Sequence, residues 1–125
     1  MPLFVYGTLQ RGGRLHGYMR GFDFVGEASV PGRLLHCGGF PGLIAGEKGE
    51  CVHGEIYRVK PGFDPEELLA GLDSVEGFSG FGRHNLYERR IITATDVAGK
   101  ETPCWVYHWM GKMALPVVEG GCWEK

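Results

Sequence analysis

The sequence predicts an α+β fold, a small mixed β-barrel with one main helix packed at an opening. Six or seven short apolar segments predict strands, and one longer segment predicts a helix. Strands and helices do not alternate along the chain, which argues against a parallel α/β sheet. Glycine accounts for 22 of the 125 residues and is scattered without a period, as expected where tight turns join short strands.

The composition is that of an ordinary globular protein, and we expect residues 1–125 to form a single domain. Hydrophobic residues make up 43% of the chain and the net charge is −2, which favours neither nucleic-acid nor membrane binding. No apolar run approaches the roughly 18 residues of a membrane span. The start, MPLFVYGTLQ, lacks the features of a secretory signal. We therefore expect a cytoplasmic protein.

Glycine and proline divide the first half of the chain into short elements. One helical turn is expected around Leu15–Met19. Strands are expected over Leu3–Tyr6, Phe22–Val30, Gly32–Cys37, Leu43–Ala45 and Val52–Val59.

The second half begins with a helix and continues with two strands. The strands are expected over Tyr87–Val97 and Cys104–Trp109, with a turn at Ala98–Gly99 between them. In the last strand Trp105, Tyr107 and Trp109 share one face, which indicates barrel packing. Residues 111–125 are expected to be irregular.

The helix carries start and stop signals in the segment DPEELLAGLDSVEG. Asp64 can cap the first turn, and Pro65 suits the first helical position. Glu67 completes a variant of the capping box, and Gly77 is a natural end. We expect a helix over residues 64–77.

One acidic residue of this helix lies on the face that should be buried. With about 100° per residue, Glu76 lies about 40° from Leu72 and inside the apolar stripe. That stripe consists of Leu68, Leu69, Leu72 and Val75. The other acidic side chains of the helix are expected to face solvent, namely Glu66, Glu67 and Asp73.

Glu76 has a structural and a functional interpretation. As a structural residue it would reach water at a frayed helix end or pair with Arg83, Arg89 or Arg90. As a functional residue it would have a raised pKa, because burial and the negative end of the helix dipole both disfavour the carboxylate. Such a group can accept and return a proton near neutral pH, so proton transfer is the chemistry that it suggests.

The segment FVYGTLQRGG adds a second candidate element. A strand ends at Gly7, and the small residues Gly7 and Thr8 let the chain turn at once. Turns of this kind expose consecutive N–H groups that bind carboxylates or oxyanions, although many are plain strand-ending turns. Neither the phosphate-binding pattern GxxxxGK[ST] nor GxGxxG occurs.

The cysteines and histidines predict no metal site, because no CxxC pair or closely spaced ligand set occurs. The four cysteines are expected to be buried or partly buried free thiols: Cys37, Cys51, Cys104 and Cys122. His84 is either an exposed loop residue or an aid to binding. The strand histidines are interpreted as structural: His36, His53 and His108.

Together these segments resemble the γ-glutamylcyclotransferase superfamily, in its AIG2-like or γ-glutamylamine cyclotransferase branch. The resemblance rests on FVYGTL, FVGEASVPGRLL with GGFPGL, GEIYRV, GLDSVEG, LYERR and the closing GGCW, in the order that the family has them. It implies that the glutamate of the LDxxE segment, Glu76, is the catalytic base. It also implies that the YG[ST]L loop, Tyr6, Gly7, Thr8 and Leu9, holds the γ-glutamyl part of the substrate, with Tyr87 nearby.

The implied reaction converts a γ-glutamyl amine or peptide into 5-oxoproline and a free amine, and it needs no cofactor. The implied partner is this small molecule, with no nucleic acid and no membrane, while the oligomeric state stays open. Within this resemblance, the segment from Gly77 to Leu86 looks longer than in the animal γ-glutamylamine enzymes, so the identity of the leaving amine is open too. Two rival readings are a binding protein of the same family without turnover and a different proton-transfer enzyme.

Overall fold

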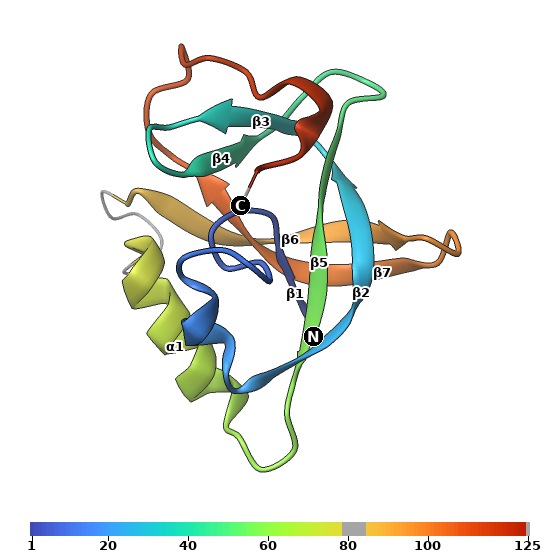
Figure 1. Ribbon diagram of the computed structural model, residues 1–125, viewed down its shortest axis with the longest axis vertical. Helices are drawn as coiled ribbons and strands as arrows, with labels where there is room; N and C mark the ends of the chain where they lie inside the picture. Colours follow the sequence, from blue (N-terminus) through green and yellow to red (C-terminus); the bar gives the residue numbers. More distant parts are fainter. Residues whose placement is uncertain (79–84, 125) are drawn as a thin grey trace.

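The chain forms one seven-stranded sheet in a computed structural model that describes residues 1–78 and 85–124 (Figure 1). The strands are β1 (Leu3–Val5), β2 (Phe22–Pro31), β3 (Arg33–His36), β4 (Pro41–Ile44), β5 (Cys51–Val59), β6 (Tyr87–Asp96) and β7 (Glu101–Trp109). The α-helix is α1 (Pro65–Glu76), and two short 3-10 helices are η1 (His16–Met19) and η2 (Glu119–Gly121). Apart from η2, which lies in the segment expected to be irregular, these bounds agree with the expected elements to within two or three residues.

Five strands close into a ring in the order β1-β5-β2-β6-β7. β1 pairs antiparallel with β5 and parallel with β7, where Leu3 lies opposite Trp105. The hairpin of β3 and β4 is attached outside the ring, because β4 pairs in parallel with β7 and β3 pairs only with β4 among the described strands. The predicted mixed barrel with one main helix is confirmed.

The alternation of side chains along the strands produces two apolar clusters. In β1, Leu3 and Val5 belong to one cluster and Phe4 to the other. The expected stripe of β7 lies in the same cluster as Leu3, and this cluster also contains Leu72 of α1. The helix is therefore fixed by packing its apolar stripe on one face of the sheet.

Both ends of α1 have the expected caps. The Asp64 carboxylate accepts a hydrogen bond from the backbone N–H of Glu66 at 3.0 Å. Gly77 adopts a left-handed conformation (φ 71°), and the N–H of Phe78 donates to the carbonyl of Asp73 at 2.9 Å. These caps place Glu76 in the last helical position, directly before the left-handed residue.

The start of β2 approaches the helix closely. A Cβ atom built on Gly21, the residue before β2, would lie 2.6 Å from the Leu68 side chain, so a larger residue here would force that side chain to move. Figure 1 shows that α1 lies alongside η1, which directly precedes this part of the chain. In the part of the chain that the structure describes, no helix is both long and apolar enough to cross a bilayer.

The expectation for the cysteines is wrong for two of the four. Cys104 is buried and Cys37 is partly buried, whereas Cys51 and Cys122 are exposed. Both exposed thiols lie at the ends of elements, Cys51 as the first residue of β5 and Cys122 directly after η2. Residues at the ends of elements are more easily exposed than residues in their centres, and the spacing of the cysteines in the sequence does not reveal this difference.

Candidate active site

A pocket of about 270 Å³ lies where the end of α1, the loop after β1 and the β4 hairpin meet. All six predicted site residues line it, namely Tyr6, Gly7, Thr8, Leu9, Glu76 and Tyr87. The rest of its wall is largely apolar and includes Leu15, Phe40, Pro41, Val75 and Leu86. The structure thus brings together two segments that lie 67 residues or more apart in the sequence.

Glu76 is a partly buried carboxylate that faces this pocket. Among the described residues it makes no hydrogen bond and no ion pair. Burial raises the pKa of Glu76 from its ordinary value of 4.5 to about 7. The direction agrees with the expectation from the sequence, and the group can therefore exchange a proton near neutral pH.

The carbonyl groups of Gly7 and Thr8, in the loop after β1, are bonded within the loop itself. The Gly7 carbonyl accepts hydrogen bonds from the backbone N–H of Gln10 at 3.1 Å and from Gln10 Nε2 at 3.3 Å. The Thr8 carbonyl accepts from the N–H of Leu15 at 3.0 Å. In a trans peptide the N–H opposes the preceding C=O, so the N–H groups of Thr8 and Leu9 point away from these two bonded carbonyls.

These amides are available to a ligand. Between described residues, no hydrogen bond uses the N–H of Gly7, Thr8 or Leu9 as its donor. All three residues line the pocket. Consecutive N–H groups of this kind can receive a carboxylate or a developing oxyanion.

Glycine is required at Gly7 by the close approach of the neighbouring hairpin. A Cβ atom at this position would lie 2.7 Å from Cγ of Pro41. A second glycine, Gly13, faces the Thr8 carbonyl, which would lie 2.2 Å from an added Cβ. The small residues of the FVYGTLQRGG segment therefore permit both the turn and its packing.

The hydroxyl groups of Tyr6 and Tyr87 hold the walls of the pocket together. Tyr6 donates to the carbonyl of Tyr107 at 2.6 Å and accepts from the N–H of Leu43 at 3.1 Å. Tyr87 donates to the carbonyl of Pro41 at 2.5 Å. Both hydroxyls are committed to the backbone, so the two tyrosines shape the site through their rings and these tethers.

The charge of the Glu76 carboxylate acts on both tyrosines. Burial, and next this charge, raise the pKa of Tyr87 above its usual range. Burial is also the main cause that raises the pKa of Tyr6, with a smaller contribution from Glu76. Both hydroxyls therefore stay protonated and act as donors.

The expected orientation of Asp73 toward solvent is wrong. Its side chain is only 15% exposed and accepts from the Tyr107 hydroxyl at 2.7 Å. It also forms a two-point ion pair with Arg89, whose Nε and Nη2 lie 2.9 and 3.3 Å from the two carboxylate oxygens. Glu66 and Glu67 are exposed, as expected.

The arginines considered as partners of Glu76 have other roles where the structure describes them. Arg89 pairs with Asp73, and its guanidinium lies 4.4 Å from the centre of the Trp105 ring. Arg90 pairs with Glu88 at 2.8 Å. The predictions for Arg83 and His84 lie outside the described residues.

The strand histidines lie away from this pocket, and a fifth histidine lies next to it. His36, His53 and His108 belong to β3, β5 and β7 and do not line the pocket. This is His16, for which no role was predicted from the sequence. Its Nδ1 lies 2.9 Å from the oxygen of the Leu9 carbonyl. A carbonyl only accepts, so Nδ1 carries the proton. Among the described residues no group of three or more His, Cys, Asp or Glu side chains could hold a metal ion.

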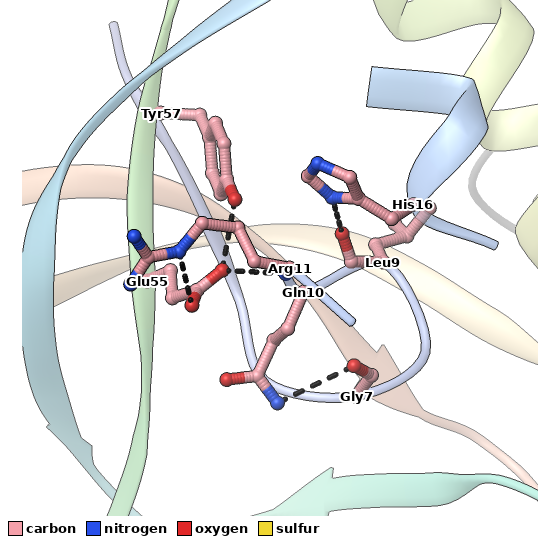
Figure 2. A network of polar contacts seen from close by, with 7 residues as sticks. All are labelled: Gly7, Leu9, Gln10, Arg11, His16, Glu55 and Tyr57. Atoms are coloured by element: carbon pink, nitrogen blue, oxygen red, sulfur yellow. Dashed lines mark hydrogen bonds and ion pairs between the residues drawn. The ribbon is translucent and has the colours of Figure 1, made fainter. Parts of the chain in front are cut away.

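Sequence reasoning missed two charged residues at the loop, Arg14 and Glu55. Arg14 is exposed and lines the pocket. Glu55 is 2% exposed and binds Arg11 of the loop, as Figure 2 shows. The alternation of β5 could have placed Glu55 on the same face as the buried Tyr57, but its partner from the loop is not visible in the sequence.

Nearly the whole chain matches a known family. The family model described as gamma-glutamyl cyclotransferase, AIG2-like, matches residues 3–125. The chain is 39% identical over 111 residues to the gamma-L-glutamyl-butirosin B gamma-glutamyl cyclotransferase of Niallia circulans, covering 86% of this chain and 66% of that protein. It is 34% identical over 118 residues to the gamma-glutamylaminecyclotransferase of Rattus norvegicus, covering 84% and 75%.

Solved structures agree with this match. An AIG2-like protein from Mus musculus has a TM-score of 0.75 and 30% identity, covering 94% of this chain and 85% of that one. The chain spans just under two thirds of some curated relatives, 66% of the Niallia protein and 63% of one from Halalkalibacterium halodurans. The model match and the identities show that the chain belongs to the gamma-glutamyl cyclotransferase, AIG2-like family, whose named members are cyclotransferase enzymes.

Proposed function

We propose that this chain is a γ-glutamyl cyclotransferase that releases 5-oxoproline from a γ-glutamyl amine or peptide, with Glu76 as general acid and base. One observation carries the proposal. Glu76, unpaired among the described residues, lines the same pocket as the unused amides of Gly7, Thr8 and Leu9. The names of the relatives support the general activity, and the chemistry of the pocket supports this division of roles.

The proposed reaction needs one proton acceptor and one anion-binding group. The α-amine of the substrate attacks its own γ-carbonyl carbon, and Glu76 takes the proton that the amine loses. A new C–N bond closes the five-membered ring, and the oxyanion forms at the amides of Thr8 and Leu9. When the original amide C–N bond breaks, Glu76 returns the proton to the leaving amine.

The shape of the pocket supplies the rest of the catalysis. Intramolecular attack in a well-oriented molecule can lower the barrier by roughly 7–11 kcal/mol. The rings of Tyr6, Phe40 and Tyr87 line the walls, and the tyrosine tethers keep these walls in place. Apolar walls also strengthen the interaction between the amides and the oxyanion, because they exclude water.

The test is 5-oxoproline release, measured by mass spectrometry with γ-glutamyl amines, γ-glutamyl dipeptides and glutathione. Glu76→Gln should abolish release while the protein stays folded, because a glutamine cannot accept the proton. Glu66→Gln is the matched control, since Glu66 is an exposed acid in the first turn of the same helix.

Three other outcomes would refute the proposal. If the Glu76→Gln variant released 5-oxoproline as fast as the wild-type protein, Glu76 could not be the general base. Binding of γ-glutamyl compounds without any product would favour the binding protein. Dependence on Glu76 with an unrelated substrate would favour a different proton-transfer enzyme.

A further inference from the structure

Glu55 is a buried carboxylate next to the loop of the pocket. Glu55 is only 2% exposed. Its carboxylate accepts three hydrogen bonds: from the backbone N–H of Arg11 at 3.0 Å, from Nε of Arg11 at 3.1 Å and from the Tyr57 hydroxyl at 2.8 Å (Figure 2). Glu55 lies in β5 and pairs with Val5 of β1, and Val5 comes two residues before Gly7 in the sequence. Burying a carboxylate is costly unless its oxygens are well bonded, so this site is closely matched to a charged side chain.

We infer that Glu55 is a positioning residue, which holds the loop after β1 so that the Thr8 and Leu9 amides face the pocket. This inference rests on the proposed function for its effect on turnover, whereas its geometric part does not. Glu55 does not line the pocket. It would act on the reaction through the backbone of Arg11.

The contacts of the loop explain how one distant bond sets the direction of the amides. The first turn is closed by the bond from Gln10 N–H to the Gly7 carbonyl at 3.1 Å. The next backbone group is the Arg11 N–H, which Glu55 fixes to β5. The peptides of Thr8 and Leu9 lie between these two points, so their orientation depends on both.

The side chain of Arg11 reinforces this attachment. Its guanidinium lies 3.7 Å from the centre of the Phe24 ring of β2, in addition to its ion pair with Glu55. Among the described residues, Glu55 is the one barrel side chain that hydrogen-bonds to residues 7–16. In the described part of the chain, the hydrogen bonds from this loop to barrel side chains thus all end on one carboxylate.

The chain contains a matched control for this arrangement. Glu50 also binds an arginine and a backbone N–H, since it accepts from Arg33 Nη2 at 2.7 Å, Arg33 Nε at 3.0 Å and Glu47 N–H at 2.7 Å. None of these three residues lines the pocket. Loss of the Glu50 bonds should therefore affect stability without affecting the site.

The test compares Glu55→Gln, Arg11→Met and Glu50→Gln with the wild-type protein below their melting temperatures. For each, kcat and KM are measured with the best γ-glutamyl substrate, and the amide signals of Thr8 and Leu9 are recorded by NMR. Glutamine at position 55 places an NH2 group against the donors of Arg11. Methionine at position 11 removes the ion pair but keeps the backbone N–H bond.

We expect Glu55→Gln to lower kcat by about tenfold or more, because small displacements of catalytic groups have effects of this order. KM should change by less than about threefold, since the oxyanion forms only during the reaction and is absent from the bound substrate. The Thr8 and Leu9 signals should shift. Arg11→Met should lose less activity, and Glu50→Gln should stay within about twofold of the wild type.

The inference is overturned if Glu55→Gln keeps kcat within about twofold of the wild type, or if Glu50→Gln loses as much activity. Unmoved Thr8 and Leu9 signals in Glu55→Gln would overturn it as well. If the wild-type protein releases no 5-oxoproline from any substrate, the proposed function fails. The NMR comparison of Glu55→Gln with Glu50→Gln then still decides whether Glu55 positions the loop.

Discussion

Replacing Glu76 by glutamine should stabilise the protein at alkaline pH and have little effect on stability at acidic pH. Burial raises the pKa of Glu76 from 4.5 to about 7, so the folded protein binds this proton more tightly than the unfolded chain. Each tenfold change in proton affinity corresponds to about 1.4 kcal/mol. The difference between the two pKa values therefore amounts to at most about 3 kcal/mol of unfolding free energy.

The sign follows from proton binding. A carboxyl group with a raised pKa contributes its full stability below about pH 4.5, and the contribution is lost as the pH rises through about 7. Above pH 7 the wild-type protein must bury a charge that the unfolded chain exposes to water. Glutamine is neutral at every pH, so the variant avoids this cost.

The measurement is urea unfolding of both proteins at pH 4 and pH 8.5. The unfolding free energy of Glu76→Gln relative to the wild type should be higher at pH 8.5 by up to about 3 kcal/mol. Glu66→Gln, which removes an exposed carboxylate from the same helix, controls for the change in net charge. A relative stability that is the same at both pH values would refute the burial of this carboxyl group.

Four further predictions concern the pocket. The value of kcat/KM should rise through about pH 7 as Glu76 loses its proton, and a flat profile from pH 5.5 to 8 would contradict this. Tyr6→Phe should lower the unfolding free energy by about 1–3 kcal/mol in denaturation experiments, because two buried backbone groups lose their partner. Gly7→Ala should lower kcat/KM by about tenfold or more, because the added Cβ would lie 2.7 Å from Pro41. A kcat/KM equal to that of the wild type would show that the loop can shift to accommodate the methyl group. Arg14→Gln should raise KM more for γ-glutamyl dipeptides than for uncharged γ-glutamyl amides, and should reduce the salt dependence of that KM, because the guanidinium at the pocket attracts the extra carboxylate.

The helix and its acidic residue could be predicted because both depend on local geometry. Asp64 and Gly77 act on the neighbouring turns, so their roles as caps follow from sequence position. The direction of Glu76 follows from the rotation of about 100° per residue. Neither step requires knowledge of where the rest of the chain lies.

Asp73 shows where this local reasoning fails. A helical projection gives the direction of a side chain but does not reveal what the sheet places opposite it. Asp73 meets the Tyr107 hydroxyl, 34 residues along the chain, and Arg89, 16 residues along. Its orientation toward solvent was predicted because Asp73 lies outside the apolar stripe of the helix, and its polar partners from the sheet show that this prediction is wrong.

The strands could be located from sequence but their pairing could not. Alternation predicted the two faces of β7, whereas the parallel contacts of β7 with β1 and β4 depend on closure of the ring. The roles of Tyr6, Tyr87 and Glu55 depend on the same closure. Each of these side chains bonds to a segment that pairing, not sequence proximity, brings within reach.

The tethers of Tyr6 and Tyr87 have a consequence for how this pocket diversifies. Both hydroxyls hydrogen-bond to the backbone of β4. This strand belongs to a hairpin that the five-stranded ring does not need for closure. Insertions or deletions at the hairpin tip near Gly38 would therefore remodel one side of the cavity while the scaffold and its acid persist. Exchange of this hairpin between relatives is a direct route to altered substrate preference by protein engineering.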